Sequence, residues 1–230
     1  MESACFMKNT LLLLISFVLL PVLSYSQKAS WSFELHGGTA YNPPLPLIIK
    51  QTGEPEIRLN ARFETRPFEA PVYWVWRISS WQEEKSWEFE AVHHKLYLLN
   101  LPDEVQKFTI SHGYNILTVN RSYRKNLFQN FPVTYRIGGG VVLAHPENRV
   151  RHKEFDQNLG AFGWGYYIRG PVLNLTLGKR FEFGKRLFLN TEAKLSPSFA
   201  RVPIVDGHAD VWNMAFQLAL GLGFNFIAGE

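Results

Sequence analysis

Large apolar residues alternate with small or polar residues along most of the chain. The longest run extends from Trp212 to Phe226, where every second side chain is large and apolar. A period of two indicates a β-strand. Strands of soluble sheets usually have about 5–6 residues, whereas a strand that crosses a bilayer needs about 9–11. The length of this run therefore predicts a membrane-spanning strand.

The same alternation predicts further strands, in which the residues between the apolar positions are mostly charged. An apolar outer face and a charged inner face are typical of a transmembrane β-barrel, whose closure satisfies every backbone group against lipid. We therefore expect an all-β fold, a closed antiparallel barrel within one domain, residues 27–230. Eight strands are predicted, near residues 210–226, 186–202, 161–183, 131–144, 105–122, 86–99, 71–81 and 55–66.

Residues 27–54 leave two alternatives open. Trp31–Tyr41 has a strand-like pattern, and Leu45–Lys50 can pair with it across Asn42–Pro44. Two added strands would give a barrel of ten, which the pattern slightly favours. Otherwise the segment plugs or caps a barrel of eight.

Turn length predicts the orientation of the barrel. Phe183–Leu187 contains Gly184 and forms a short turn, which is typical of the periplasmic side, whereas the long polar segment 145–160 is then outside the cell. Two strands carry glycines where the alternation shifts or a bend is expected, at His112–Tyr114 and at Gly138–Gly140. We expect a bulge or bend at each, which re-aims the neighbouring side chains.

The first 26 residues have the pattern of a secretory signal peptide. Lys8 precedes the uncharged apolar run Thr10–Val22, and Ser24 and Ser26 provide small residues at the exit. A transmembrane anchor would need about 20 apolar residues, and this run is shorter. Together with the strands, this segment predicts the cell outer membrane as the location.

Composition excludes several classes of protein. With 46% hydrophobic and 19% charged residues the chain is not disordered. The single cysteine, Cys5, excludes a disulfide framework and a cysteine zinc site. The net charge of +4 is too diffuse to indicate nucleic acid, and no glycine-rich phosphate loop indicates a cofactor.

The inner faces of the predicted strands collect acids and bases in equal number. Buried charges persist when they are paired, so we expect an interlocked network that fills the lumen. A narrow pore or a ligand cavity is the alternative. The predicted lumen residues are Glu56, Arg58, Arg62, Glu64, Arg77, Glu88, Glu90, His94, Arg136, Arg180, Glu182, Glu192 and Lys194.

Four residues are candidates for catalysis: His94, His112, Ser111 and Glu90. A serine hydrolase needs a base and an acid within hydrogen-bond reach, but Ser111 and His112 are neighbours and point to opposite faces of a regular strand. The same divergence separates His93 from His94, so we expect no metal site among these histidines.

The predicted external loop carries further histidines and charges. His145, His152 and Glu147 are expected there as solvated side chains. The basic group Arg149, Arg151 and Lys153 could contact lipopolysaccharide.

As a whole the chain resembles the small outer-membrane β-barrel proteins of Gram-negative bacteria. The resemblance is carried by the signal segment Met7–Ser26, the alternating strands and the aromatic-ended strand Trp212–Phe226. It implies location in outer-membrane lipid, and it marks Phe224 and Phe226 as the signal that the barrel-assembly machinery reads. The lipid A deacylases place His and Ser two residues apart, followed by Asn. The segment Ser111–Asn115 lacks that spacing, so no catalytic residue is carried over.

These observations favour an integral outer-membrane barrel with a largely salt-bridged lumen and a structural or binding role. An outer-leaflet lipid A hydrolase or acyltransferase is one alternative, and a narrow passive channel is another. The ligand and the oligomeric state are left open.

Overall fold

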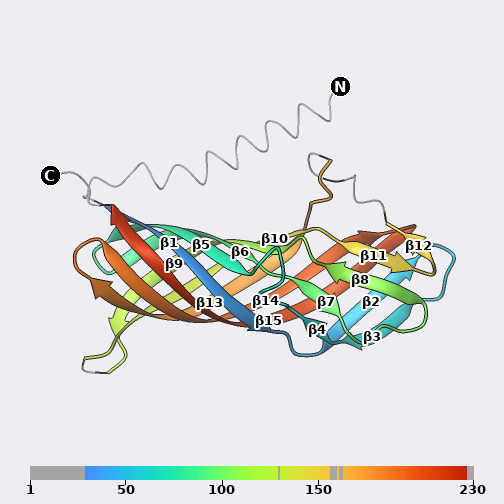
Figure 1. The fold of residues 1–230 in the computed structure, drawn as a ribbon, viewed down its shortest axis with the longest axis horizontal. Coiled ribbons are helices and arrows are strands. Elements are labelled where there is room, and N and C mark those ends of the chain that lie inside the picture. Colours follow the sequence, from blue (N-terminus) through green and yellow to red (C-terminus); the bar gives the residue numbers. More distant parts are fainter. Residues whose placement is uncertain (1–28, 129, 156–159, 161–162, 227–230) are drawn as a thin grey trace.

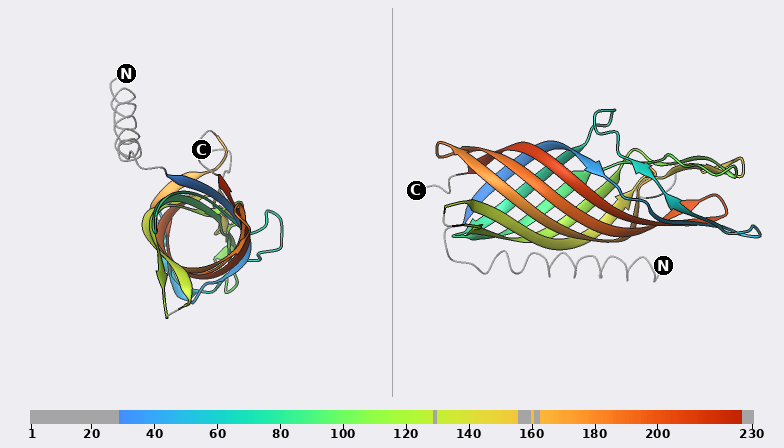
Figure 2. Two further views of the ribbon diagram at one scale, coloured as in Figure 1. Left: turned by 90° about the vertical axis from the view of Figure 1, so that its left-hand side faces the viewer. Right: turned by 90° about the horizontal axis from the view of Figure 1, so that it is seen from below.

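Eight long antiparallel strands form a ring in the computed structural model, which describes residues 29–128, 130–155, 160 and 163–226 (Figures 1 and 2). The order around the ring is β1-β5-β6-β9-β10-β13-β14-β15, and β15 pairs again with β1. Each ring strand therefore has a neighbour on both sides and no free edge. The ring strands are β1 (Ser30–Tyr41), β5 (Trp74–Gln82), β6 (Lys85–His93), β9 (Tyr114–Asn126), β10 (Pro132–Ala144), β13 (Tyr167–Phe183), β14 (Leu187–Ile204) and β15 (Gly207–Phe226).

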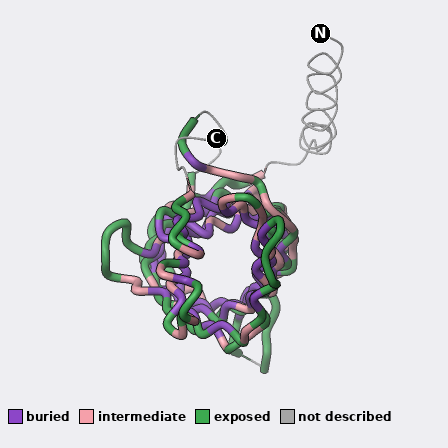
Figure 3. Tube along the Cα trace, turned by 90° about the vertical axis from the view of Figure 1, so that its right-hand side faces the viewer, coloured by how far each residue is buried: buried purple, intermediate pink, exposed green. Residues whose placement is uncertain are grey.

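The outer surface of the ring is apolar. Large side chains at every second position are exposed, while the intervening small or polar ones are buried, so that exposed and buried residues alternate around the ring (Figure 3). This is the arrangement of a barrel that faces lipid. Among the described residues, no helix is long and apolar enough to cross a membrane. The exposed residues include Trp31, Phe33, Leu35, Ile137, Leu173, Leu175, Leu177, Trp212, Phe216, Leu218, Leu220 and Leu222.

The ring has eight strands and not ten, and its first strand is β1 rather than residues 55–66, with which the eight-strand alternative began. β1 takes the place that we expected for residues 55–66, because it pairs with β15 from Trp31–Phe226 to Tyr41–Phe216. β2 (Leu45–Gln51) does not turn back on β1. It pairs instead with the far end of β15 and with β3 (Ile57–Ala61). In the described part of this segment, β1 is therefore a ring strand, and β2 lies beyond the ring rather than inside it as a plug.

Two predicted strands are each divided at the rim of the ring. The segment 86–99 forms β6 and β7 (Leu96–Leu98), and 105–122 forms β8 (Val105–Ile110) and β9. The predicted bend at Gly113 is confirmed, since this residue joins β8 to β9 with φ of 139°. Only glycine adopts such a conformation readily.

Beyond the rim, a second sheet has the order β12-β11-β8-β7-β4, with β4 (Phe63–Glu64), β11 (Glu147–Val150) and β12 (Lys153–Glu154). We call this sheet, together with β2, β3 and the outer ends of β14 and β15, the head (right in Figure 1). One apolar cluster joins the two sheets of the head. It includes Leu47, Ile49, Leu96, Phe108, Ile110, Val150, Val202 and Ile204.

The short turn between β13 and β14 and the segment 147–155 lie at opposite ends of the ring (Figure 1). That segment is not the solvated loop that was expected, because it forms β11 and β12, and His145 and Glu147 are buried. The predicted signal peptide, residues 1–26, lies outside the described residues.

Candidate functional site

A row of three charged residues crosses neighbouring strands inside the ring. Glu34 on β1 lies opposite Arg77 on β5, which lies opposite Glu90 on β6. Opposite charges at directly paired positions attract each other across the strands. Arg77 donates from Nη1 to Glu34 Oε2 at 3.1 Å and from Nε to Glu90 Oε2 at 2.9 Å. Its side chain is completely buried.

The far wall of the ring completes this network. Arg77 Nη1 and Nη2 each donate to Glu192 on β14 at 2.7 Å. Arg136 on β10 lies 3.0 Å from Glu192 and donates to Glu88 at 2.9 Å. Charged side chains therefore bridge the lumen from wall to wall. We call them the lumen cluster: Glu34, His36, Arg77, Glu88, Glu90, Arg136, Glu192 and Lys194.

The lumen cluster leaves little space for solvent. Lys194 Nζ donates to both oxygens of Glu90 at 2.6 and 2.7 Å, and His36 Nε2 lies 3.4 Å from Glu34. Asn190 and Asn174 add hydrogen bonds to Glu34 and Glu90. No member of the cluster is more than 4% exposed. An eight-stranded ring is about wide enough for side chains to fill, and here they do so.

Six of the predicted lumen residues lie in this cluster: Arg77, Glu88, Glu90, Arg136, Glu192 and Lys194. Arg180 lies nearer the turn end, with its guanidinium 3.2 Å from the centre of the Phe188 ring, and it pairs with the half-exposed Glu182. Glu34 and His36 were missed, because the place of residues 27–54 was left open and no lumen residue was predicted within that segment.

Four predicted lumen residues lie outside the ring: Glu56, Arg58, Arg62 and Glu64. They belong to the segment of β3 and β4, which forms part of the head, and Arg58, Arg62 and Glu64 are exposed. Arg58 pairs with Glu56, and Glu64 pairs with Arg66. The prediction was wrong because this segment has no ring strand beside it.

His94 is buried but does not belong to the charged network. Its Nε2 lies 3.0 Å from Asn42 Oδ1, and its ring meets the edge of the Tyr114 ring. Around this level the inner faces of the ring strands are apolar, as at Val75, Val92 and Ile116. An apolar layer thus closes the lumen between the charged cluster and the head.

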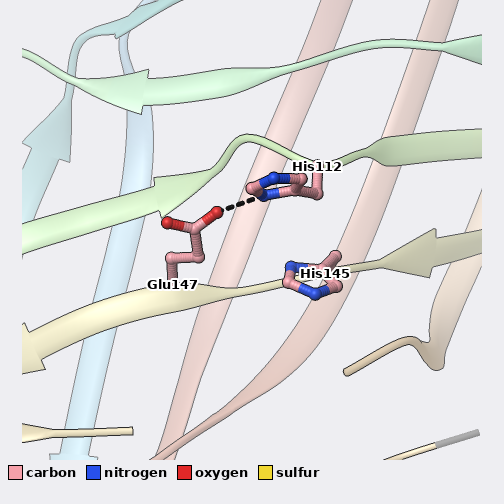
Figure 4. A group of neighbouring side chains, drawn as sticks. All are labelled: His112, His145 and Glu147. Carbon is pink, nitrogen blue, oxygen red and sulfur yellow. Dashed lines mark hydrogen bonds and ion pairs between the residues drawn. The ribbon is translucent and has the colours of Figure 1, made fainter. Parts of the chain in front are cut away.

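A second polar group lies at the rim, where ring and head meet (Figure 4). The β9–β10 pairing ends at Tyr114–Ala144, and the β8–β11 pairing starts at Thr109–Glu147. Between these pairs, the backbone N–H of His145 donates to the Gly113 carbonyl at 2.9 Å. The interruption between β8 and β9 and the interruption between β10 and β11 therefore lie side by side. We call the side chains gathered there the rim cluster: Ser111, His112, His145 and Glu147.

Glu147 is the centre of the rim cluster. It accepts hydrogen bonds from Ser111 Oγ at 2.5 Å and Lys107 Nζ at 2.7 Å, and its Oε1 also contacts His112 Nδ1. Burial alone would raise the pKa of Glu147, but these contacts lower it to about 2. Burial lowers the pKa of His145, and the neighbouring His112 adds to this effect. A carboxylate therefore lies beside a neutral imidazole near neutral pH.

The structure separates the four catalytic candidates. Glu90 belongs to the lumen cluster and His94 to the apolar layer, whereas Ser111 and His112 lie at the rim. At the rim, Ser111 Oγ and His112 Nδ1 both contact the same oxygen of Glu147. A catalytic triad needs the histidine between serine and acid. Ser111, His112 and Glu147 therefore do not form that relay.

Among the described residues, two groups have the donors and spacing for a metal ion. One is His112, His145 and Glu147 at the rim, and the other is Glu34, His36 and Glu192 in the lumen. Neither was found from the sequence, since each combines residues of strands that become neighbours only in the fold.

The ring, its apolar outer belt and its filled lumen define the class of protein, a small transmembrane β-barrel of the outer-membrane type. No protein-family model and no curated protein matches the chain. Among solved structures it is similar to the outer membrane protein AlkL in lipid bilayers, with 15% identity, a TM-score of 0.47 and coverage of 90% of this chain and 98% of that one. It is also similar to OprG of Pseudomonas aeruginosa, with 13% identity, a TM-score of 0.46 and coverage of 88% and 98%. It is similar as well to Ail, the attachment invasion locus protein of Yersinia pestis, with 10% identity, a TM-score of 0.39 and coverage of 87% of this chain and 100% of that one.

Proposed function

We propose that this protein is an integral outer-membrane barrel that holds the head at the outer face of the membrane, where the head has a binding role. One observation carries the proposal: the lumen is filled by the lumen cluster and then by an apolar layer. A filled barrel acts as an anchor rather than as a pore. The structured part beyond it is then the part that meets a partner.

The construction of the head supports this role. Its two sheets share an apolar core in which Leu47, Phe108 and Ile110 are at most 1% exposed. Long loops that only connect barrel strands do not need such a core. A preformed surface loses less conformational entropy on binding than a flexible loop does.

The basic residues of the head give weaker support for binding to lipopolysaccharide. Arg149 pairs with Glu154, and Lys153 pairs with Asp206 at 2.8 Å. Arg151 donates to Gln51 Oε1 at 2.7 Å and to the Pro55 carbonyl at 2.8 Å. The two ion pairs balance the charges of Arg149 and Lys153, which favours a partner recognised by shape over a purely anionic one.

The barrel-assembly machinery remains a proposed partner. Phe224 and Phe226 end β15 at the turn end, and their rings pack together at 5.4 Å between centroids. Phe226 is 48% exposed. Both rings are thus placed at the terminus of the last strand, where an assembly signal is expected.

Two experiments on the full-length protein test the proposed function. Unboiled samples from outer-membrane fractions should migrate faster on a gel than boiled ones, since a folded barrel resists detergent. In planar bilayers the purified protein should show no discrete conductance, with a general porin as the positive control. A steady single-channel current would contradict the anchoring role and favour the passive channel.

The lipid A-modifying alternative has a separate test. Mass spectrometry of lipid A should give the same acylation pattern in cells with the protein, in cells without it, and in cells that carry Ser111→Ala. A pattern that depends on Ser111 would overturn the non-enzymatic assignment.

A further inference from the structure

We propose that the rim cluster binds a divalent transition-metal ion such as Zn²⁺ through His112, His145 and Glu147. This site lies outside the membrane-spanning part of the ring and goes beyond the proposed anchoring role. It needs neither an open lumen nor a catalytic reaction.

The donor atoms already lie close together. One ring nitrogen from each histidine and one carboxylate oxygen of Glu147 are within 4.8 Å of one another. The two imidazole rings are 5.0 Å apart between centroids, and both lie beside the Glu147 carboxylate (Figure 4). Two imidazoles and one carboxylate suit Zn²⁺ and similar ions. Three protein ligands leave a fourth position for water or for a group of a binding partner.

The backbone explains why these side chains meet. His112 and His145 come from neighbouring chain segments, so the divergence that separates adjacent strand residues does not apply to them. The break at Gly113 interrupts the strand at this point, and the His145–Gly113 backbone hydrogen bond aligns the two segments. By contrast, His93 and His94 hydrogen-bond to different residues, Asn115 and Asn42.

The imidazole of His145 supplies a second, independent observation in favour of a metal ion at this site. The residue is 8% exposed, and its Nδ1 is buried without a hydrogen-bond partner among the described residues. Buried polar atoms are nearly always satisfied, so an unsatisfied one requires an explanation such as an ion. A metal ion held within reach of the imidazole would provide the partner.

Neighbouring groups hold the histidines in place. Tyr166 Oη donates to the His112 carbonyl at 2.9 Å, and the Tyr166 ring packs edge-on against His145 at 5.0 Å. Lys107 binds the second oxygen of Glu147, Oε2. The Tyr166 contacts orient the two histidines, as the outer contacts of metal ligands do. The Lys107 ammonium also repels a cation, so its removal should strengthen metal binding.

Solvent access and charge both favour the rim cluster over the lumen cluster as the metal site. The His112 side chain is 57% exposed, so an ion can reach the site from solution. The alternative group of Glu34, His36 and Glu192 is buried, and its carboxylates already bind Arg77 and Arg136. Two guanidinium groups therefore already neutralise these carboxylates and would repel a cation.

The test uses the full-length barrel in detergent, without a histidine tag and with Zn²⁺ alone as the probe. Titration calorimetry should show one saturable site. His112→Ala removes an exposed ligand and should weaken binding by at least about tenfold, whereas Lys107→Met should strengthen it several-fold. His152→Ala, a change at an exposed histidine elsewhere in the head, is the matched control and should leave the affinity unchanged.

A second readout reports the ligands directly. Co²⁺ added in place of Zn²⁺ should give visible absorption bands that His112→Ala and Glu147→Gln abolish. Each variant is first checked for the fast-migrating unboiled band, so that loss of folding is distinguished from loss of the site. Absence of saturable Zn²⁺ binding in the folded wild type, or equal affinities in wild type and His112→Ala, would overturn the proposal. Either result would leave the anchoring role untouched.

Discussion

The inward-facing side chains are charged or polar in the ring and apolar in the head. In the membrane-spanning part, β14 directs the charged Glu192 and Lys194 inward, whereas in the head it directs Val202 and Ile204 inward. The outward face changes in the opposite sense, from Leu187 near the turn end to Arg201 in the head. One strand therefore inverts its polarity along its length.

The medium outside the strand explains this inversion. Lipid surrounds the ring, so an apolar side chain is no more stable in the lumen than on the outer surface. A charged side chain costs less free energy in the lumen than in lipid, provided that it is paired there. Water surrounds the head, so burial of apolar groups drives its folding as in any soluble domain. The change occurs just beyond the paired rings of Phe199 and Trp212, whose centroids are 4.7 Å apart. Aromatic rings at this level are typical of the membrane interface.

The largest effect is expected from removal of the central cation. Arg77→Met leaves Glu34, Glu90 and Glu192 without the guanidinium that joins them. Breaking a buried ion pair in this way costs about 3–5 kcal/mol. Urea unfolding in lipid vesicles, followed by tryptophan fluorescence, measures the change.

Arg121→Met is the matched control, because Arg121 is only partly buried and lies over the Trp87 ring. We expect it to cost less than about 1 kcal/mol. Equal losses for the two variants would show that the lumen charges do not stabilise the ring.

A cavity in the head should unfold the head and spare the ring. Phe108 is 1% exposed in the apolar core, and Phe108→Ala should cost about 3 kcal/mol of head stability. Limited proteolysis should then cleave the head, while unboiled samples keep the fast-migrating band. Loss of that band would mean that ring and head fold as one unit.

The alternation of side chains was sufficient to predict a barrel but not to choose its first strand. Both Trp31–Tyr41 and residues 55–66 alternate, and period two is the same for a ring strand and a head strand. What separates them is the partner: β1 lies beside β15, and β3 lies beside β2. Pairing between distant segments has no local signal.

Prediction of the rim cluster also required knowledge of which distant segments pair. The shift of alternation at Gly113 correctly marked a bend, yet it did not show what would lie opposite. His145 comes beside it only because the register pairs Tyr114 with Ala144. Six lumen residues were found because alternation alone decides which side of a correctly assigned strand faces inward.

A double-mutant cycle sharpens the comparison between the charges of the two regions. Lys194 and Glu90 are completely buried and 2.6 Å apart, whereas Lys153 and Asp206 are half-exposed at 2.8 Å. We expect a coupling energy of about 2 kcal/mol for Lys194→Met with Glu90→Gln, since buried partners depend on each other. For Lys153→Met with Asp206→Asn, water should reduce the coupling to below about 1 kcal/mol. The unfolding midpoints of the four single and two double variants give both values, and similar couplings would contradict the assigned difference in environment.

The smallest effect concerns the pair that lies just beyond the aromatic boundary. Arg201 donates to Asp210 from Nε at 2.6 Å and from Nη2 at 3.1 Å, and this hydrogen bonding lowers the pKa of Asp210. A carboxyl whose pKa is lower in the folded state adds stability above its unfolded pKa, and this stability is lost as the pH falls through the folded pKa. Because Arg201 is 55% exposed, Asp210→Asn should cost less than about 1 kcal/mol at pH 7. The difference between the unfolding midpoints of wild type and Asp210→Asn should then shrink as the pH is lowered below 4. A difference that stays constant into acid would mean that the pair contributes through packing rather than charge, and the outer end of the strand would then be stabilised by its apolar face alone.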